Sequence, residues 1–506
     1  MSDAEGLMWR LEKDPYLSSS VGNVTILDRP IDVDRFRRRL ERAVLAVPRL
    51  HQRVQPAPVN LSAPLWVDDP EFDIHYHVRH VALPQPGSIR QLLDLATLMT
   101  SDPFDRTRPL WQFTVVDGLA GGRAAVIQKM HHTIADGEGS IQLSMQFLDM
   151  QRDAPDPPPV APGAFDVTES AEPSAGDAMR ELFTGSMRLP IGIVRQMREL
   201  LGDPAQVPGA SMAVAETIRA IVSQLSDVDR ARSPLWTQRS LHRSLEVLRV
   251  PFAATKDAAK RLGGTVNTAF IAAAAHGAGE YHRALGAPTD QLRASMAIST
   301  RTRGSGANAF SLARLLVPTG EMPIAERFRA INEASATARE TSATAALDKL
   351  AAVAANLPTS LVTRLARQQA QTVDFATSNV RGAPVPVYLS GAKILENYPI
   401  GPLLGVSFNL TLLSYAGSLD MGVNIDTAAI AEPARLRDSL ERAFIELIAA
   451  GQEPKRRARK PRQTVGASAA ATAPTSTGAS TTTGRVRRER TSSRRSATSP
   501  VETSSR

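Results

Sequence analysis

A proline-rich segment divides the chain into two halves, each of which alternates helical and extended patterns. Residues 154–163 read Ala-Pro-Asp-Pro-Pro-Pro-Val-Ala-Pro-Gly, and this density of proline favours an extended surface connection. At 506 residues the chain exceeds what one hydrophobic core usually organises. We therefore expect an α/β (α+β) protein with two similarly built lobes.

Apolar spacing predicts the main elements of each half. In the first half, residues 1–152, we expect helices over 34–47, 89–99 and 140–150, the last with Ser140 as N-cap, and strands over 23–27, 112–116 and 123–130. In the second half, residues 235–451, we expect helices over 253–262, 265–281 and 436–448 and strands over 294–299, 405–413 and 419–425.

The connecting region, residues 153–234, holds an amphipathic pattern over 177–201 with interleaved arginines, which Pro190 should kink. Two interpretations stay open. The segment could be a helix that covers a groove between the lobes, or a helix that lies on a membrane surface, because apolar bulk with arginine suits an interface.

The positive charge of the chain is concentrated in its last residues. The whole chain carries 59 basic and 51 acidic residues, but residues 452–506 alone carry 13 basic and 3 acidic ones. The remainder, with 46 basic and 48 acidic residues, is close to neutral, so we expect no specific nucleic-acid partner. The low apolar content of the tail predicts disorder. It could be a solubilising tail or an electrostatic attachment to an anionic membrane.

Cysteine usage and hydropathy limit the remaining classes. The chain has no cysteine, which excludes disulfides, thiolate zinc sites and a cysteine acyl-enzyme. The first residues do not resemble a signal peptide, and no run of about 18 apolar residues predicts a membrane span. We therefore expect a cytoplasmic protein.

The segment His131-His132-Thr-Ile-Ala-Asp136-Gly137 carries the clearest chemical signal. It lies between a predicted strand and a predicted helix. A neutral imidazole at such a junction can accept the proton of a hydroxyl group at neutral pH. His131, His132 and Asp136 are also metal-ligand types, but adjacent histidines on a strand point to opposite faces. Since no second ligand cluster accompanies them, we expect no metal.

This segment resembles the HHxxxDG motif of the CoA-dependent acyltransferase superfamily, which includes chloramphenicol acetyltransferases and peptide-synthetase condensation domains. Further matches narrow the resemblance to the bacterial wax ester synthase/diacylglycerol acyltransferase family and follow its order over roughly residues 1–450. They are Arg-Pro-Leu-Trp at 108–111, Gly-Leu-Ala-Gly-Gly-Arg at 118–123, Lys-Met-His-His at 129–132, Thr-Val-Asn at 265–267, Ser-Asn-Val at 378–380 and the segment 408–417.

The chain departs from the family pattern at two places. Thr268 follows Asn267 where the family usually has aspartate, and Arg381-Gly-Ala-Pro stands where Pro-Gly-Pro is usual. These departures bear on substrate handling and leave the histidine pair intact. The basic tail lies outside the family pattern.

The resemblance implies two chloramphenicol-acetyltransferase-like lobes with the active site in a tunnel between them. It implies transfer of a long-chain acyl group from acyl-CoA, a co-substrate, with no cofactor. The acceptor would be diacylglycerol, giving triacylglycerol, or a long-chain alcohol, giving a wax ester. We expect attachment to the inner face of the membrane or to a lipid-droplet surface; the oligomeric state is left open.

The resemblance also implies residue roles. His132 would be the general base, and His131 would face away and orient it. Asp136 would hold the loop through a cationic partner, for which Arg301 is the candidate. Gly137 would allow close backbone approach. Asn267, Asn379 and Asn409 would either donate hydrogen bonds to the oxyanion or cap turns.

Two other functions remain as alternatives. One is a different HHxxxDG acyltransferase that makes another lipid ester, a polyketide ester or an amide. The other is a catalytically weak lipid-binding homologue, which the departures at Thr268 and Arg381 favour and the complete HHxxxDG segment disfavours.

Overall fold

The computed structural model describes most residues of the two lobes. The described residues are 1–56, 64–135, 137–156, 158–161, 164–165, 231–299, 310–342 and 359–452. Asp136, Arg301, the amphipathic pattern over 177–201 and the basic tail therefore lie outside them. Within the described residues, no helix combines the length and the hydropathy that crossing a membrane requires.

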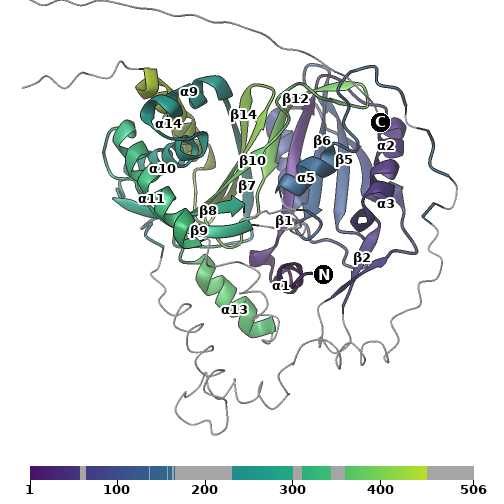
Figure 1. Cartoon of the computed structure of the whole chain (residues 1–506), viewed down its shortest axis with the longest axis horizontal. Coiled ribbons are helices and arrows are strands. Elements are labelled where there is room, and N and C mark those ends of the chain that lie inside the picture. Colours follow the sequence, from purple (N-terminus) through teal and green to yellow (C-terminus); the bar gives the residue numbers. More distant parts are fainter. Residues whose placement is uncertain are drawn as a thin grey trace, which may run out of the picture. The chain divides into compact units, whose positions relative to one another are not determined.

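Two six-stranded mixed sheets form the framework of two lobes (Figure 1). The first has the order β11-β12-β1-β6-β5-β4, with β1 Ser20–Leu27, β4 Val78–Ala82, β5 Trp111–Leu119, β6 Arg123–His131, β11 Tyr388–Leu389 and β12 Ala392–Ile400. The second has the order β7-β14-β13-β10-β8-β9, with β7 Arg243–Pro251, β8 Gln291–Ser299, β9 Phe310–Pro318, β10 Phe375–Arg381, β13 Phe408–Tyr415 and β14 Ser418–Asp426. A separate ribbon pairs β2 Gln52–Gln55 with β3 Leu65–Asp68.

Both faces of the first sheet are covered, which explains why its central strand β6 is apolar over most of its length. Val126 of β6 packs into one cluster with Phe36 and Leu40 of α2 (Val33–Ala46). Its neighbour Ile127 packs into another cluster with Leu92 of α4 (Ile89–Ser101) on the opposite face. The shorter helices of this lobe are α1 Asp3–Leu11, α3 Ile74–His77, α5 Gly137–Ser144 and the 3₁₀ turns η1 Pro15–Leu17 and η2 Pro48–Leu50.

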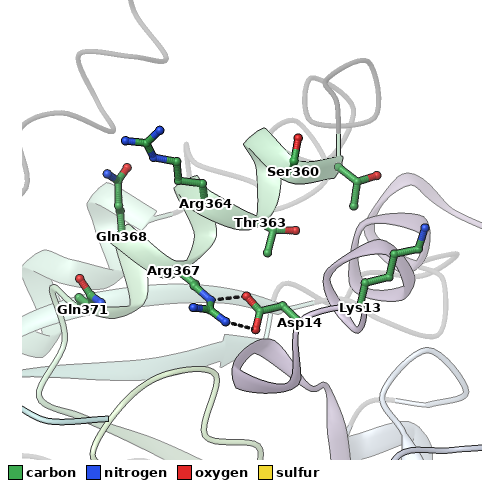
Figure 2. Close-up of a pocket in the computed structure, with 9 residues that line it drawn as sticks. Lys13, Asp14, Ser360, Thr363, Arg364, Arg367, Gln368 and Gln371 are labelled. Atoms are coloured by element: carbon green, nitrogen blue, oxygen red, sulfur yellow. Dashed lines mark hydrogen bonds and ion pairs between the residues drawn. The ribbon is translucent and has the colours of Figure 1, made fainter. Parts of the chain in front are cut away.

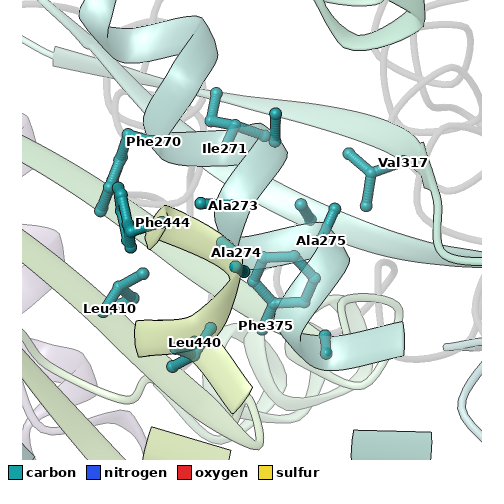
Figure 3. Packing of buried hydrophobic residues seen from close by; sticks show 14 of the residues in the cluster. Phe270, Ile271, Ala273, Ala274, Ala275, Val317, Phe375, Leu410, Leu440 and Phe444 are labelled. Atoms are coloured by element: carbon teal, nitrogen blue, oxygen red, sulfur yellow. The ribbon is translucent and has the colours of Figure 1, made fainter. Parts of the chain in front are cut away.

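The second sheet packs its core against closely spaced helices (Figure 3). They are α9 Phe252–Leu262, α10 Val266–Ala284, α11 Ile324–Ser342 and α14 Pro433–Gln452. Residues 272–275 of α10 are four consecutive buried alanines, so neighbouring helices can approach it closely. A Cβ atom at Gly277 would lie 2.8 Å from the Cα atom of Leu440 on α14, so this crossing requires glycine. A further helix, α13 Thr359–Ala370, contacts α1 of the first lobe.

The second half of the chain contributes two strands to the first sheet. β12 pairs antiparallel with β1, placing Tyr398 opposite Val24, and β11 pairs with β12 at the sheet edge. β12 also contacts β13 and β14 of the second sheet. β12 thus connects the lobes: it is hydrogen-bonded into the first sheet, although its residues come from the second half of the chain. The boundaries at 1–152, 153–234 and 235–451 stay predictions.

Most expected elements of the described residues are confirmed, and two need correction. The helix expected over 140–150 begins earlier, at Gly137, and ends at Ser144. It cannot continue, because Asp149 exchanges main-chain hydrogen bonds of 2.8 Å with Tyr388 and forms an ion pair of 2.6 Å with Arg39. The strand expected over 405–413 begins at Phe408, because Leu404 and Gly405 adopt positive φ and turn the chain.

Candidate active site

The histidine pair lies where the central strand β6 of the first sheet ends. His131 is opposite Ser20 of β1, and its main-chain N–H donates to the Leu110 carbonyl at 2.9 Å. The N–H of His132 donates to the Ser19 carbonyl at 3.1 Å. Main-chain hydrogen bonds to segments on both sides of β6 therefore set the direction in which the chain leaves the sheet.

His131 is buried and is held on both ring nitrogens. The main-chain N–H of Thr133 donates to its Nδ1 at 3.2 Å, and the Thr133 hydroxyl lies 2.8 Å from the same atom. Because a main-chain N–H can only donate, Nδ1 accepts and the ring proton lies on Nε2. That nitrogen is 3.2 Å from Oε2 of Glu12, so it donates to the carboxylate. His131 is thereby oriented inside the fold.

Glu12, the C-cap residue of α1, connects the two histidines. Its carboxylate accepts from the Ser18 hydroxyl at 2.7 Å and from the Ser19 N–H at 2.6 Å, in addition to His131. Burial alone would raise the pKa of this carboxyl, but these hydrogen bonds hold it below its usual value. Since the Ser19 carbonyl receives the N–H of His132, one ionised carboxylate supports the His131 ring and the main chain of His132.

Arg49 holds Thr133, the residue that follows the histidine pair. Its guanidinium donates to the Thr133 carbonyl at 2.8 Å and pairs with the buried carboxylate of Glu5 in α1. It also lies 5.1 Å from the centre of the Trp66 ring. Charge-assisted contacts of this kind are stronger than neutral ones, so they restrict the loop that follows the histidine pair.

The residues that precede the histidine pair in the sequence support the end of β6. The indole N–H of Trp111 donates to the Leu50 carbonyl at 2.7 Å, and both Leu110 and Trp111 are buried. Lys129 donates to the Asp102 carbonyl at 2.6 Å, and its ammonium lies 4.2 Å from the centre of the Phe104 ring. The rings of Phe104 and His131 pack edge to face. Burial lowers the pKa of Lys129 to about 8.

The second lobe meets this region through β10. The helix that follows the histidine loop, α5, begins at Gly137 and lies against β10, as Figure 1 shows. Asn379 on β10 donates to the side-chain oxygen of Asn267 at 3.3 Å. Asn267, in the first turn of α10, donates in turn to the sulfur of Met296 at 3.2 Å. Two of the predicted site residues, far apart in sequence, are thus brought together.

Comparison with known proteins decides the family. A family model described as the wax ester synthase/diacylglycerol acyltransferase catalytic domain matches residues 1–270, and the C-terminal domain of the same family matches residues 306–448. A Mycobacterium tuberculosis protein provisionally named a diacylglycerol O-acyltransferase is 33% identical over 457 residues, covering 88% of this chain and 91% of that one. The chain belongs to the wax ester synthase/diacylglycerol acyltransferase family.

Other matches agree with this family. A second provisionally named M. tuberculosis diacylglycerol O-acyltransferase is 28% identical over 463 residues, covering 85% of this chain and 93% of that one. The protein is therefore an acyltransferase of the wax ester synthase/diacylglycerol acyltransferase family.

Solved structures confirm the expected fold class. The wax ester synthase/diacylglycerol acyltransferase from Marinobacter aquaeolei VT8 matches with a TM-score of 0.58 at 23% identity, covering 86% of this chain and 95% of that one. The trichothecene 15-O-acetyltransferase TRI3 from Fusarium sporotrichioides matches with a TM-score of 0.55 at 12% identity, covering 88% and 94%. At these identities the likeness concerns the fold.

The departure from the family pattern at Thr268 is accommodated by helix capping. Thr265 is the N-cap of α10, and its hydroxyl accepts from the Thr268 N–H at 3.2 Å. The Thr268 hydroxyl, buried, donates to the side chain of Asn332 on α11 at 2.9 Å. Thr268 therefore joins two helices of the second lobe. Arg381, the other departure, is exposed at the end of β10.

The remaining predicted residues fall into two groups. Asn409 lies on β13, is buried and donates to the Pro402 carbonyl at 2.7 Å, so its side chain holds the turn that precedes this strand. Asp136 and Arg301 lie outside the described residues, so their pairing stays a prediction. Among the residues that the structure does describe, no group of three or more histidine, aspartate or glutamate side chains is placed to hold a metal ion.

Sequence reasoning missed the supports of the loop, above all Glu12 and Arg49. Glu12 is separated from His131 by 119 positions, and Arg49 from Thr133 by 84. No local spacing connects residues so far apart. The one available signal was the capping box of α1, formed by Ser2 and Glu5, which indicated a stable N-terminal helix but not its contacts.

Proposed function

We propose that this protein transfers a long-chain acyl group from acyl-CoA to the hydroxyl group of diacylglycerol, forming triacylglycerol, with His132 as the general base. The observation that carries the proposal is the position of His132 directly after a fixed neighbour. His131 is buried and held at both ring nitrogens, and His132 follows it, half-buried at the strand end, with its main-chain N–H bonded to the Ser19 carbonyl. Family membership and the names of the relatives support the substrate class.

In the proposed reaction, Nε2 of His132 accepts the proton of the acceptor hydroxyl as its oxygen attacks the thioester carbonyl. The new C–O bond produces a tetrahedral oxyanion. Its collapse breaks the C–S bond, and the leaving thiolate takes the proton from the imidazolium. General-base assistance of this kind contributes about 10²–10⁴ in rate. No acyl-enzyme and no cofactor are required, because binding both substrates together supplies the proximity.

The other predicted residues take supporting roles in this proposal. Asp136 orients the loop, with Arg301 as its cationic partner, and Gly137 allows close backbone approach at the first residue of α5. The amide pair of Asn379 and Asn267 supplies hydrogen bonds on the side of the second lobe, either to the oxyanion or to the turn before α10. A long-chain alcohol is the second acceptor, giving wax esters, and the description of the family supports it.

The test is acyl transfer by the purified protein from labelled palmitoyl-CoA to dioleoylglycerol or hexadecanol, followed by separation of the lipids. His132→Ala should lower kcat at least about 100-fold without changing the unfolding temperature. His75→Ala is the matched control, since His75 is an exposed histidine on α3. Near-full activity of His132→Ala would remove His132 as the base, and no ester with either acceptor would remove the substrate assignment.

A further inference from the structure

The loop that carries the histidine pair is held by charged side chains and by the start of β5. Glu12 at the end of α1 bonds the ring of His131. This end of α1 is fixed in turn by Asp14, which accepts hydrogen bonds from Arg367 of α13, at 2.6 Å from Nη2 and also from Nε (Figure 2). Arg49 holds the loop from another segment. The charged contacts are thus anchored in the fold, and the start of β5 is the remaining support.

The start of β5 contacts the loop through its main chain and through an indole. The Leu110 carbonyl accepts the N–H of His131 at 2.9 Å, and Trp111 follows as the first residue of β5. The Trp111 indole donates to the Leu50 carbonyl at 2.7 Å, and Leu50 directly follows Arg49. The position of Trp111 therefore affects both the main chain of His131 and the segment that carries Arg49.

Trp111 packs against His77, which is the last residue of α3 and is completely buried. Their rings stack with centres 4.4 Å apart and planes 18° apart, and Phe72 stacks on the same histidine at 5.3 Å. Nδ1 of His77 donates to the main-chain carbonyl of Trp111 at 2.7 Å. Because a carbonyl can only accept, the proton of the neutral ring lies on Nδ1, and Nε2 carries the lone pair.

The surroundings of His77 disfavour a second proton on its ring. Nε2 is buried and has no hydrogen-bond partner among the residues that the structure describes. Arg108 and Arg79 lie over the neighbouring Tyr76 ring, with guanidinium carbons 4.9 and 5.3 Å from its centre. Burial is the largest cause that lowers the pKa of His77, to about 4; the two arginine charges add to it, and the Asp73 carboxylate opposes it.

We propose that neutral His77 is a positioning residue for the histidine loop, and that its protonation releases the start of β5 and the loop with it. This role rests on the proposed function, in which the loop carries the general base. An imidazolium would place a second N–H group against aromatic rings, near two guanidinium groups and without an acceptor among the described residues. Mild acid therefore favours states in which His77 reaches water.

Hydrogen exchange of the main-chain N–H groups of His131 and His132, measured on the full chain at pH 7.5 and pH 5.0, tests this coupling. An open loop exposes His77 with its ordinary pKa of 6.5, against about 4 in the closed loop, so closure is weakened only as the pH falls below 6.5. Exchange corrected for its intrinsic rate should be about 25-fold faster at pH 5.0 in the wild type. His77→Asn keeps an N–H donor near the place of Nδ1 and cannot be protonated, so this difference should largely disappear.

His282→Asn is the matched control, because His282 forms a corresponding pair in the second lobe. Its ring centre lies 4.4 Å from that of Trp236, and its Nδ1 donates to the Ala278 carbonyl at 2.7 Å. This control should retain the wild-type pH effect at the histidine loop. If both asparagine variants lose the effect alike, the loop opens only with the whole protein and the proposal is overturned. An unchanged effect in His77→Asn overturns it as well.

Steady-state acyl transfer at pH 7.5 gives a second measurement. His77→Leu removes the donor to Trp111 and should lower kcat about tenfold, with KM for palmitoyl-CoA within about twofold, and His77→Asn should restore most of kcat. A kcat of His77→Leu equal to that of the wild type would refute the positioning role. Failure of the proposed function is recognised separately, by the absence of ester product in the wild type while the exchange difference between wild type and His77→Asn persists.

Discussion

At the scale of single residues, His131 and His132 are neighbours in the chain, but the first is a buried structural residue and the second is the proposed general base. The ring of His131 is directed through Nε2 to the carboxylate of Glu12, and it is one of the buried polar groups of the first lobe. The Glu12 carboxylate accepts three hydrogen bonds, which hold it and the groups that donate to it in fixed positions. The loop of the proposed base is therefore positioned by the residue that caps α1, far away in the sequence.

Glu12→Gln should lower kcat about tenfold while KM for acyl-CoA stays within about twofold. The amide keeps the shape of the side chain but loses the charge that His131 and Ser19 bond to, which costs about 1.5–3 kcal/mol for a charged hydrogen bond. Steady-state kinetics and thermal unfolding measure both effects. The exposed Glu71, replaced by Gln, serves as control. An unchanged kcat in Glu12→Gln would refute the positioning role.

Because Lys129 is buried, the free energy of unfolding should depend on pH in the alkaline range. Burial lowers its pKa from the usual 10.5 to about 8, so between these values the unfolded chain carries a proton that the folded protein has released. The free energy of unfolding should therefore rise with pH across this window, by up to about 3 kcal/mol. Below pH 8 both states are protonated and this contribution stays constant.

Denaturant unfolding at pH 7.5 and pH 10 measures the effect. Lys129→Met should remove it, so the difference in unfolding free energy between the two pH values should be smaller than in the wild type. Lys260→Met, at an exposed position of α9, should retain the wild-type difference. Equal pH dependence in Lys129→Met and wild type would contradict the assignment.

At the scale of elements, the site depends on contacts between segments that are distant in the chain. α1 supplies Glu5 and Glu12 to the loop after β6, and β10 of the second sheet lies against α5. β12 pairs with β1 while it also contacts β14. Strand packing around β12 therefore contributes to the relation between the lobes, together with the contacts of α5 with β10 and of α1 with α13.

Gly422→Ala should destabilise the protein by about 1–3 kcal/mol, because it overpacks this contact. A Cβ atom at Gly422 of β14 would lie 2.0 Å from the carbonyl oxygen of Pro399 on β12, and a backbone atom cannot yield as a flexible side chain can. Gly6→Ala on α1 is the control, since its Cβ would meet Pro64 at an ordinary 3.5 Å. Alanine there should preserve or raise stability. Chemical denaturation compares the two, and equal stability would contradict the close packing.

On the scale of the whole molecule, the described residues form part of one compact unit, Met1–Glu453, and the basic tail follows it. The acceptors of the proposed reaction are insoluble in water, so the protein must reach them at a lipid surface. We propose that the tail, with 13 basic and 3 acidic residues over 452–506, attaches the protein to the anionic inner face of the membrane or to lipid inclusions.

A chain that ends at Glu453 should keep its activity on detergent-dispersed substrate and bind phosphatidylglycerol vesicles more weakly than the full chain. The difference should shrink as salt rises, because each basic residue near the surface contributes up to about 1 kcal/mol that ions screen. Vesicle sedimentation at two salt concentrations measures it. Equal binding at low salt would eliminate this role of the tail, and lost activity would assign the tail to the catalytic unit.

Local patterns were enough for most elements and for the histidine motif. Helices such as α2 and α4 follow from apolar residues at helical spacing, because each buries one face against a sheet. The family followed from short motifs in a preserved order. Patterns of this kind are readable because their physical cause, the burial of one face or a tight turn, acts over a few residues.

The tertiary structure alone decided which distant residues meet. β11 and β12 belong to the first sheet although they come from the second half, and Glu12 and Arg49 hold a loop more than eighty residues away. The helix after the motif stops at Ser144 because Asp149 finds partners in Arg39 and Tyr388. Hydrogen bonds and ion pairs of this kind have no sequence period, since their partners are selected by packing of the whole chain.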